Sequence, residues 1–186
     1  MCLSLQKGAT TFKKAGEDIV CYKVLVKNDT LRTLNSPYQW TGYKLGQLKV
    51  DKIPVKKEVV NTTNILSKTE KTVESGVFHS FKFYDDAKEF AIEAVASRYW
   101  KYYNDNYPVV VKCFIPKGSR YYEGMFGGVL YPKYQCYGSK QLKVGDEITY
   151  VPTWEDVKDA CPFPYINQLK EEVLRLTGIP KERFNQ

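Results

Sequence analysis

Short runs of β-branched and aromatic residues, separated by glycine or proline, recur along this chain without regular alternation with helices. The strongest run is 109–115, and 18–27 and 77–83 resemble it. Such runs are typical of strands, and the glycines and prolines between them mark turns. A parallel, doubly wound fold needs strands and helices in alternation. We therefore expect an α+β fold: a curved, mainly antiparallel sheet packed by one long helix, with a small helical C-terminus.

Two segments carry a helical period of apolar residues. Residues 84–103 place Ala87, Ala91 and Val95 at helical spacing, which predicts the long helix. The segment 153–186 holds a short amphipathic pattern and predicts the helical C-terminus. The remaining predictions concern irregular structure: a lead-in over 1–16, a loop over 31–46, and turns at 138–139 and 145–146.

The length and composition suit one globular domain over residues 1–186. The chain has 186 residues, of which 43% are hydrophobic and 26% are charged. Its most polar stretch, 61–76, is rich in Thr, Asn, Lys and Glu and predicts a mobile surface loop. Such a loop could also act as a lid over a nucleotide pocket, although its sequence names no ligand.

The cysteine and histidine content restricts where the protein is located and which cofactors it could hold. Five widely spaced cysteines, with no C-x-x-C pair and no secretory signal, indicate reduced thiols and a cytoplasmic protein. This content does not suit a zinc site, so we expect no metal and no cofactor. No apolar run is long enough to cross a bilayer, so no membrane partner is expected. The oligomeric state has no signature in the sequence.

The net charge of +7 favours an acidic partner, which could be nucleic acid, a nucleotide or an acidic protein surface. Plain solubility is the alternative explanation. Arg98, Trp100 and Lys101 lie in a stretch where cations alternate with tyrosines. Bases stack on such rings while cations contact phosphate. The same stretch would also suit a protein interface or a helix with one apolar and one solvated face.

A second basic and aromatic stretch follows the predicted strand 109–115. Pro116 to Ser119 form a turn with a glycine, and a strand follows it. The candidate binding residues here are Lys117, Ser119, Arg120, Tyr121 and Tyr122. Their side chains and the turn amides could cradle a phosphate, although the order of a Walker A loop is absent. The alternative is an ordinary β-hairpin whose turn is basic.

Three residues define an alternative, catalytic hypothesis. Removal of Met1 would expose the amino group of Cys2, which could then activate its own thiol as an N-terminal nucleophile. His79, as the only histidine, could act as a general base. Glu123, between aromatic residues, could have a raised pKa and pair with His79. Each also has a structural interpretation: a small N-terminal residue, a hydrogen-bonded strand histidine and an exposed glutamate.

The order of several short segments resembles that of uncharacterised small accessory proteins carried by phages and gut bacteria. The segments are Cys21–Val24, Ser36–Tyr38, Val77–Phe81, Ile115–Gly124 and Gly138–Lys140, and some of those proteins also begin Met-Cys-Leu. The resemblance covers roughly residues 18–150. It implies a genomic setting and no activity, so no functional residue is transferred from it.

The leading hypothesis is a non-catalytic binding protein whose basic, aromatic surface engages an acidic partner. A phage accessory protein acting on host machinery would fit this hypothesis through the resemblance. The alternative is a small enzyme that uses Cys2, or a His79/Glu123 pair, for acyl or glycosyl transfer.

Overall fold

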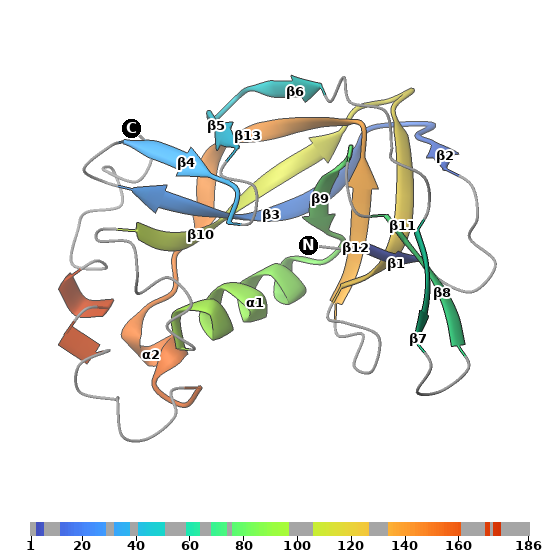
Figure 1. Ribbon diagram of the computed structural model, residues 1–186. Coiled ribbons are helices and arrows are strands. Elements are labelled where there is room, and N and C mark those ends of the chain that lie inside the picture. The colour runs from blue at the N-terminus through green and yellow to red at the C-terminus, as the bar shows by residue number, and fades with distance from the viewer. Residues whose placement is uncertain are drawn as a thin grey trace. The chain divides into compact units, whose positions relative to one another are not determined.

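The computed structural model describes residues 3–5, 12–28, 32–37, 41–50, 59–63, 68–73, 76–96, 106–126, 134–160, 170–171 and 173–175. Within these ranges the chain is dominated by antiparallel sheet with small helices, which confirms the α+β class (Figure 1). The elements are β1 (Leu3–Leu5), β2 (Lys13–Lys14), β3 (Ile19–Asn28), β4 (Thr33–Asn35), β5 (Gly42–Tyr43), β6 (Leu48–Val50), β7 (Val59–Thr63), β8 (Lys68–Val73), β9 (Phe78–Phe81), α1 (Tyr84–Ala96), β10 (Asn106–Ile115), β11 (Arg120–Phe126), β12 (Tyr134–Ser139), β13 (Gln141–Tyr150) and α2 (Trp154–Val157).

The chain divides into two compact units, and the expectation of one domain over 1–186 stays a prediction. Unit 1 comprises Met1–Tyr22, Leu48–Asp86 and Cys113–Lys143, and unit 2 comprises Lys23–Gln47, Ala87–Lys112 and Val144–Gln186. The ten-residue strands β3, β10 and β13 each contribute residues to both units. The boundaries therefore fall inside strands, where composition carries no signal of a linker.

Unit 1 contains a ladder of strands in the order β9–β12–β11–β1–β8–β7, and β2 also pairs with β11. The predicted lead-in over 1–16 thus contributes two strands, β1 and β2. The predicted loop over 61–76 overlaps β7 and β8, which pair antiparallel over five residue pairs. Both strands are rich in valine and threonine, whose branched side chains favour the extended backbone even in a polar stretch.

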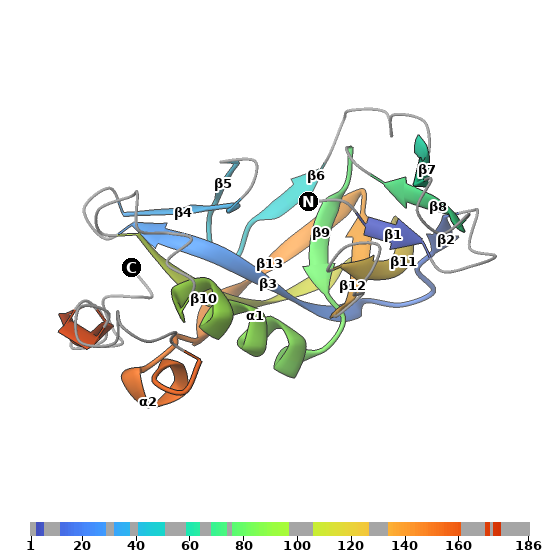
Figure 2. The ribbon, with the colours of Figure 1, turned by 60° about the horizontal axis from the view of Figure 1, so that its bottom comes forward.

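Unit 2 contains the strands β4 and β5, which pair in sequence onto β3 where a loop over 31–46 was expected. Figures 1 and 2 both show β4 running beside β3. The middle of β10 is a fully buried valine run, Val109–Val111. A continuous apolar run of this kind is typical of a strand covered on both faces.

The helix α1 begins at Tyr84, as its sequence predicts, and the part of it in unit 2 carries the buried positions. Acidic Asp85 and Asp86 occupy the first turn, where the helix dipole favours negative charge. The helix is described to Ala96, and the predicted continuation towards residue 103 lies outside the described residues. Among the described helices, none is long and apolar enough to cross a membrane.

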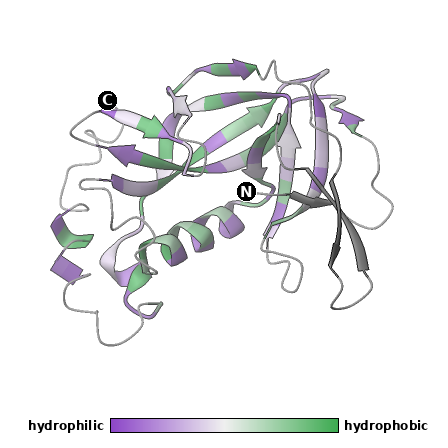
Figure 3. Cartoon of the chain, viewed as in Figure 1, coloured by the Kyte–Doolittle hydropathy of each residue, from purple (hydrophilic) through white to green (hydrophobic). Residues whose placement is uncertain are grey.

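The core of unit 2 forms where small residues of α1 meet the sheet. The buried helix residues recur at spacings of three and four, and apolar colour recurs along the helix in Figure 3. Ala94 clusters with Val26 of β3. A second cluster joins α1 to β10, α2 and a C-terminal helical residue; its buried members are Val95, Tyr107, Val157 and Val173.

Two predicted turns are strand interiors. Residues 138–139 lie inside β12, and the chain bends only at Lys140. Residues 145–146 lie inside β13. A Cβ atom at Gly145 would lie 2.5 Å from the carbonyl oxygen of Lys112, closer than a side chain tolerates. The glycine therefore permits a close backbone approach and does not mark a turn.

Candidate functional site

The sequence-predicted site residues that the structure describes lie in unit 1, on β9, on β11 and in the turn before β11. Cys2 lies outside the described residues, and so do Arg98, Trp100 and Lys101. Their proposed roles therefore stay predictions. Of the two stretches that were expected to form one surface, 98–103 lies outside the described residues and 117–122 lies within them.

The turn 116–119 is not a phosphate cradle, because its amides already have acceptors. The amide of Lys117 donates to Asp18 Oδ1 at 2.8 Å. The amide of Gly118 donates to the carbonyl of Ala15 at 2.8 Å, and that of Ser119 to Pro116 at 3.0 Å. A carboxylate of the same chain therefore occupies a position where a phosphate would have to bind.

Ser119, at the end of this turn, is buried. Its side chain is buried, and its hydroxyl donates to Gln141 Oε1 at 3.2 Å. It links the start of β11 to the first residue of β13. We therefore remove Ser119 from the predicted binding residues.

The strand register separates the remaining residues onto two faces of the ladder. Tyr122 lies opposite Gly138, which lies opposite His79. Glu123 lies opposite Tyr137, which lies opposite Ser80. Because paired residues share a face and consecutive residues alternate, these two rows point to opposite sides.

The proposed His79/Glu123 pair is therefore not formed. Its two members project from different faces of the sheet, and His79 is buried on its own side. Local composition could not reveal this, because a shift of one residue in register would have placed both on one face.

Glu123 instead lies between two lysines, on what we call the glutamate face. It accepts a hydrogen bond from Lys13 Nζ, and its Oε1 lies 3.8 Å from Lys82 Nζ. The hydrogen bond to Glu123 raises the pKa of Lys13 above its ordinary value. On this face both lysines share one carboxylate of the chain itself.

The glutamate face also carries a buried phenol, Tyr137. Its ring meets Tyr121 edge-on at 5.7 Å, and Lys82 Nζ lies 6.0 Å from its centroid. Burial raises the pKa of Tyr137 to about 12, and the nearby negative charge of Glu123 adds to this effect. The phenol is therefore neutral at physiological pH.

Two buried serines, Ser80 and Ser139, complete this face. Their exposed fractions are 2% and 0%, and their hydroxyls make no hydrogen bond within the described structure. Such hydroxyls are unusual, because a buried polar group normally has a partner. They contribute polarity to the interior of the ladder without an evident structural role.

The opposite face carries a cluster that we call the basic aromatic surface: Phe12, Lys14, Lys117, Arg120 and Tyr122. All of them are exposed except Tyr122, which is half-buried. The Arg120 guanidinium lies 4.4 Å from the centroid of the Phe12 ring. That ring meets Tyr122 edge-on at 6.4 Å, and 44% of Phe12 is exposed. Lys14 lies opposite Arg120 in the β2–β11 pair.

The turn brings a further cation to this surface. A Cβ built at Gly118 would lie 4.0 Å from Cε of Lys14, so the Lys14 side chain runs beside the turn. Lys117 precedes this glycine and is exposed. Three cations therefore gather at one end of a pair of aromatic rings, of which Phe12 is exposed and Tyr122 is half-buried.

No family model, curated protein or solved structure matches this chain. The function is therefore argued from the geometry of the site alone. Among the described residues, no group of three or more His, Cys, Asp or Glu side chains could hold a metal ion.

Sequence reasoning missed Phe12 and Lys14, because 1–16 was interpreted as an irregular lead-in. The signal was present in Phe12-Lys13-Lys14, where an aromatic residue and two cations adjoin. A two-residue strand has too few positions to show a period. The function of these residues depends on the partner strand that β2 joins.

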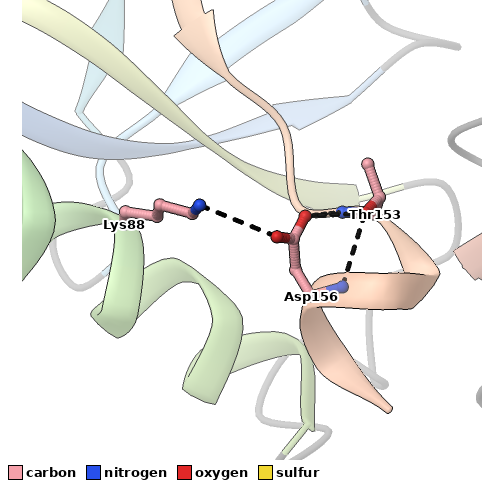
Figure 4. A network of polar contacts seen from close by, with 3 residues as sticks. All are labelled: Lys88, Thr153 and Asp156. Atoms are coloured by element: carbon pink, nitrogen blue, oxygen red, sulfur yellow. Dashed lines mark hydrogen bonds and ion pairs between the residues drawn. The ribbon is translucent and has the colours of Figure 1, made fainter. Parts of the chain in front are cut away.

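A polar network in unit 2 has a structural role (Figure 4). Asp156 accepts hydrogen bonds from the amide and hydroxyl of Thr153, at 2.9 and 2.6 Å. Its other oxygen lies 3.7 Å from Nζ of Lys88 on α1. The network caps α2 and ties it to α1, so all its groups have local partners.

Proposed function

We propose that this chain is a non-catalytic, cytoplasmic binding protein whose basic aromatic surface engages an acidic partner. The observation that carries the proposal is the exposed stack of Arg120 on Phe12, with Lys14 beside it. Exposed aromatic rings next to cations are typical of surfaces that bind polyanions. The resemblance to phage and gut-bacterial accessory proteins supports a setting in which such a protein acts on host machinery.

The charge distribution in unit 1 supports this choice of surface. Lys13 and Lys82 both pair with the single carboxylate of Glu123 on the glutamate face. Lys14, Lys117 and Arg120 are exposed and form no ion pair within the described ranges. Among the described residues, their side-chain charges are therefore available to an external anion.

The cytoplasmic part of the proposal rests on the thiols. Cys21, Cys113 and Cys136 are buried thiols and not disulfides. Thiols stay reduced in a reducing compartment.

The test is the affinity of the protein for heparin, a generic polyanion, as a function of salt. We expect the double variant Lys117→Glu/Arg120→Glu to bind at least tenfold more weakly and to reduce the slope of log K against log salt by about 1 to 2. A matched control is Lys44→Glu/Lys143→Glu, which makes the same charge change at two exposed lysines elsewhere. Equal losses in both variants would show that only net charge matters and would remove this surface.

A further inference from the structure

We propose that the partner of the basic aromatic surface is single-stranded nucleic acid, with bases stacked on the Phe12–Arg120 pair and phosphates at Lys14 and Lys117. This inference rests on the proposed function and specifies its ligand class. The observation that supports it is the order of aromatic and cationic residues along β11.

The surface consists of an aromatic row followed by a cationic row. Arg120 lies opposite Lys14, and Tyr121 lies opposite Lys13. Continued by one residue, this register would place Phe12 opposite Tyr122, and the two rings meet edge-on at 6.4 Å. Alternate residues on a strand are about 6.8 Å apart, two rises of about 3.4 Å, so the backbones of the two rows are separated by about this distance. The Arg120 side chain reaches back from the cationic row, and its guanidinium lies 4.4 Å from the centroid of the Phe12 ring.

Arg120 and Phe12 form a stack to which a further planar group can be added. The guanidinium lies 4.4 Å from the ring centroid, and both side chains are exposed. The Phe12 ring is in contact with Arg120 and, edge-on, with Tyr122. A base can extend this stack on the guanidinium plane or on the phenyl ring, since nucleobases stack on both kinds of group.

Lysine side chains extend the basic aromatic surface away from the rings. Lys14 passes beside the turn at Gly118, and Lys117 adjoins that glycine. Because the turn amides are occupied by Asp18 and by backbone carbonyls, they offer no rigid phosphate cradle. Phosphate contacts therefore come from mobile lysine side chains, which suits a ligand bound without regard to its sequence.

The exposed rings distinguish a single strand from the other acidic partners. A duplex buries the faces of its bases in its own stack, so it would offer phosphates and base edges only. An acidic peptide would use the cations and leave Phe12 in water. Only an unstacked base uses both rows at once, which is the arrangement that β11 and residues 12–14 present.

The experiment measures fluorescence anisotropy of a labelled oligothymidylate of about 12 nucleotides, within the range of known single-strand sites, from about 50 to 200 mM salt. The matching duplex, heparin and poly-glutamate serve as competitors. We expect Phe12→Ala to weaken oligothymidylate binding about 5- to 100-fold, as loss of one stacked base predicts. Its affinity for heparin should change less than twofold.

The matched control is Phe83→Ala. Phe83 is 46% exposed in the same unit, and Lys82 Nζ lies 5.6 Å from its ring, so it is a second exposed aromatic residue beside a cation. It lies outside the basic aromatic surface, and its removal should leave binding unchanged. A second variant, Arg120→Lys, keeps the charge but loses the planar group, and should weaken oligothymidylate more than heparin. Circular dichroism of every variant checks that each is folded.

The outcomes separate this inference from the proposed function. Strong oligothymidylate binding that is lost in Phe12→Ala and kept in Phe83→Ala supports both. Equal binding of oligothymidylate and heparin, unaffected by Phe12→Ala, overturns the single-strand inference and leaves the acidic-partner proposal standing. Preference for the duplex or for poly-glutamate also overturns the inference. Failure to bind any of these polyanions overturns both.

Discussion

Because Tyr137 is buried, unit 1 should become less stable at alkaline pH. Its pKa is raised from 10.0 to about 12, chiefly because burial disfavours the phenolate. The stabilisation is therefore fully present below pH 10 and is lost as the pH rises towards 12. We expect the unfolding free energy of the wild type to fall by up to about 3 kcal/mol more than that of Tyr137→Phe over this range.

Urea unfolding at neutral pH and at several alkaline pH values measures this difference. Tyr22→Phe, at a half-buried tyrosine of the same unit, is the control. If Tyr137→Phe and the wild type lose stability in parallel above pH 10, Tyr137 titrates as an ordinary phenol.

Ser139 and Ser119 should respond to alanine in opposite directions. The Ser139 hydroxyl is fully buried and has no hydrogen-bond partner in the described structure. Its removal in Ser139→Ala should raise the unfolding free energy by about 1 kcal/mol. Ser119, also buried, bonds to Gln141, so Ser119→Ala should lower it by about 1 kcal/mol. Thermal and urea unfolding of both variants check the sign; destabilisation by Ser139→Ala would mean that its hydroxyl has a bound partner.

At the scale of an element, the short helix α2 depends on its capping box. The amide of Asp156 donates to the Thr153 hydroxyl, and the amide of Thr153 donates back to the Asp156 carboxylate. Helices this short have little stability of their own, so the cap and the contact with α1 must hold α2 in place. We expect Thr153→Ala to lower the unfolding free energy by about 1 kcal/mol.

The control for this element is Glu155→Ala. The Glu155 side chain is 74% exposed and, among the described residues, pairs with Lys158, three residues away, so its loss should cost less than about 0.5 kcal/mol. Burial raises the pKa of Asp156, but the hydrogen bonds from Thr153 and the charge of Lys88 outweigh burial and lower it overall. The stabilisation by Asp156 is therefore present above pH 3.8 and is lost as the pH falls below that value. Thr153→Ala should weaken this acid dependence, and an unchanged acid limb would exclude the capping role.

At the scale of the whole molecule, the long strands explain why a division into two units was not foreseen. The residues of β10 up to Lys112 belong to unit 2, and those from Cys113 onward belong to unit 1. The run 109–115 that predicted this strand spans the boundary. Local patterns report the state of the backbone, whereas membership of a unit depends on contacts with distant segments.

The element types were largely predictable from the chain. The strand over 18–27 and the strand over 109–115 are observed as β3 and β10, and the helix begins at Tyr84 as expected. Turn predictions that relied on glycine were wrong where the glycine lets a neighbouring strand approach closely, as Gly145 does beside Lys112. The chemistry of one residue cannot distinguish a turn from a close approach, since both need the absence of a side chain.

The sequence alone determined that 18–27 and 109–115 are extended, that a helix begins at Tyr84, and where cations and aromatic rings adjoin along the chain. These properties follow from neighbouring residues, through branched side chains, apolar periods and turn formers. Only the tertiary structure decided that Phe12 joins Arg120, that Asp18 fills the turn, and that His79 and Glu123 face opposite ways. Those outcomes depend on the register between distant strands, where a shift of one residue exchanges the two faces of a sheet.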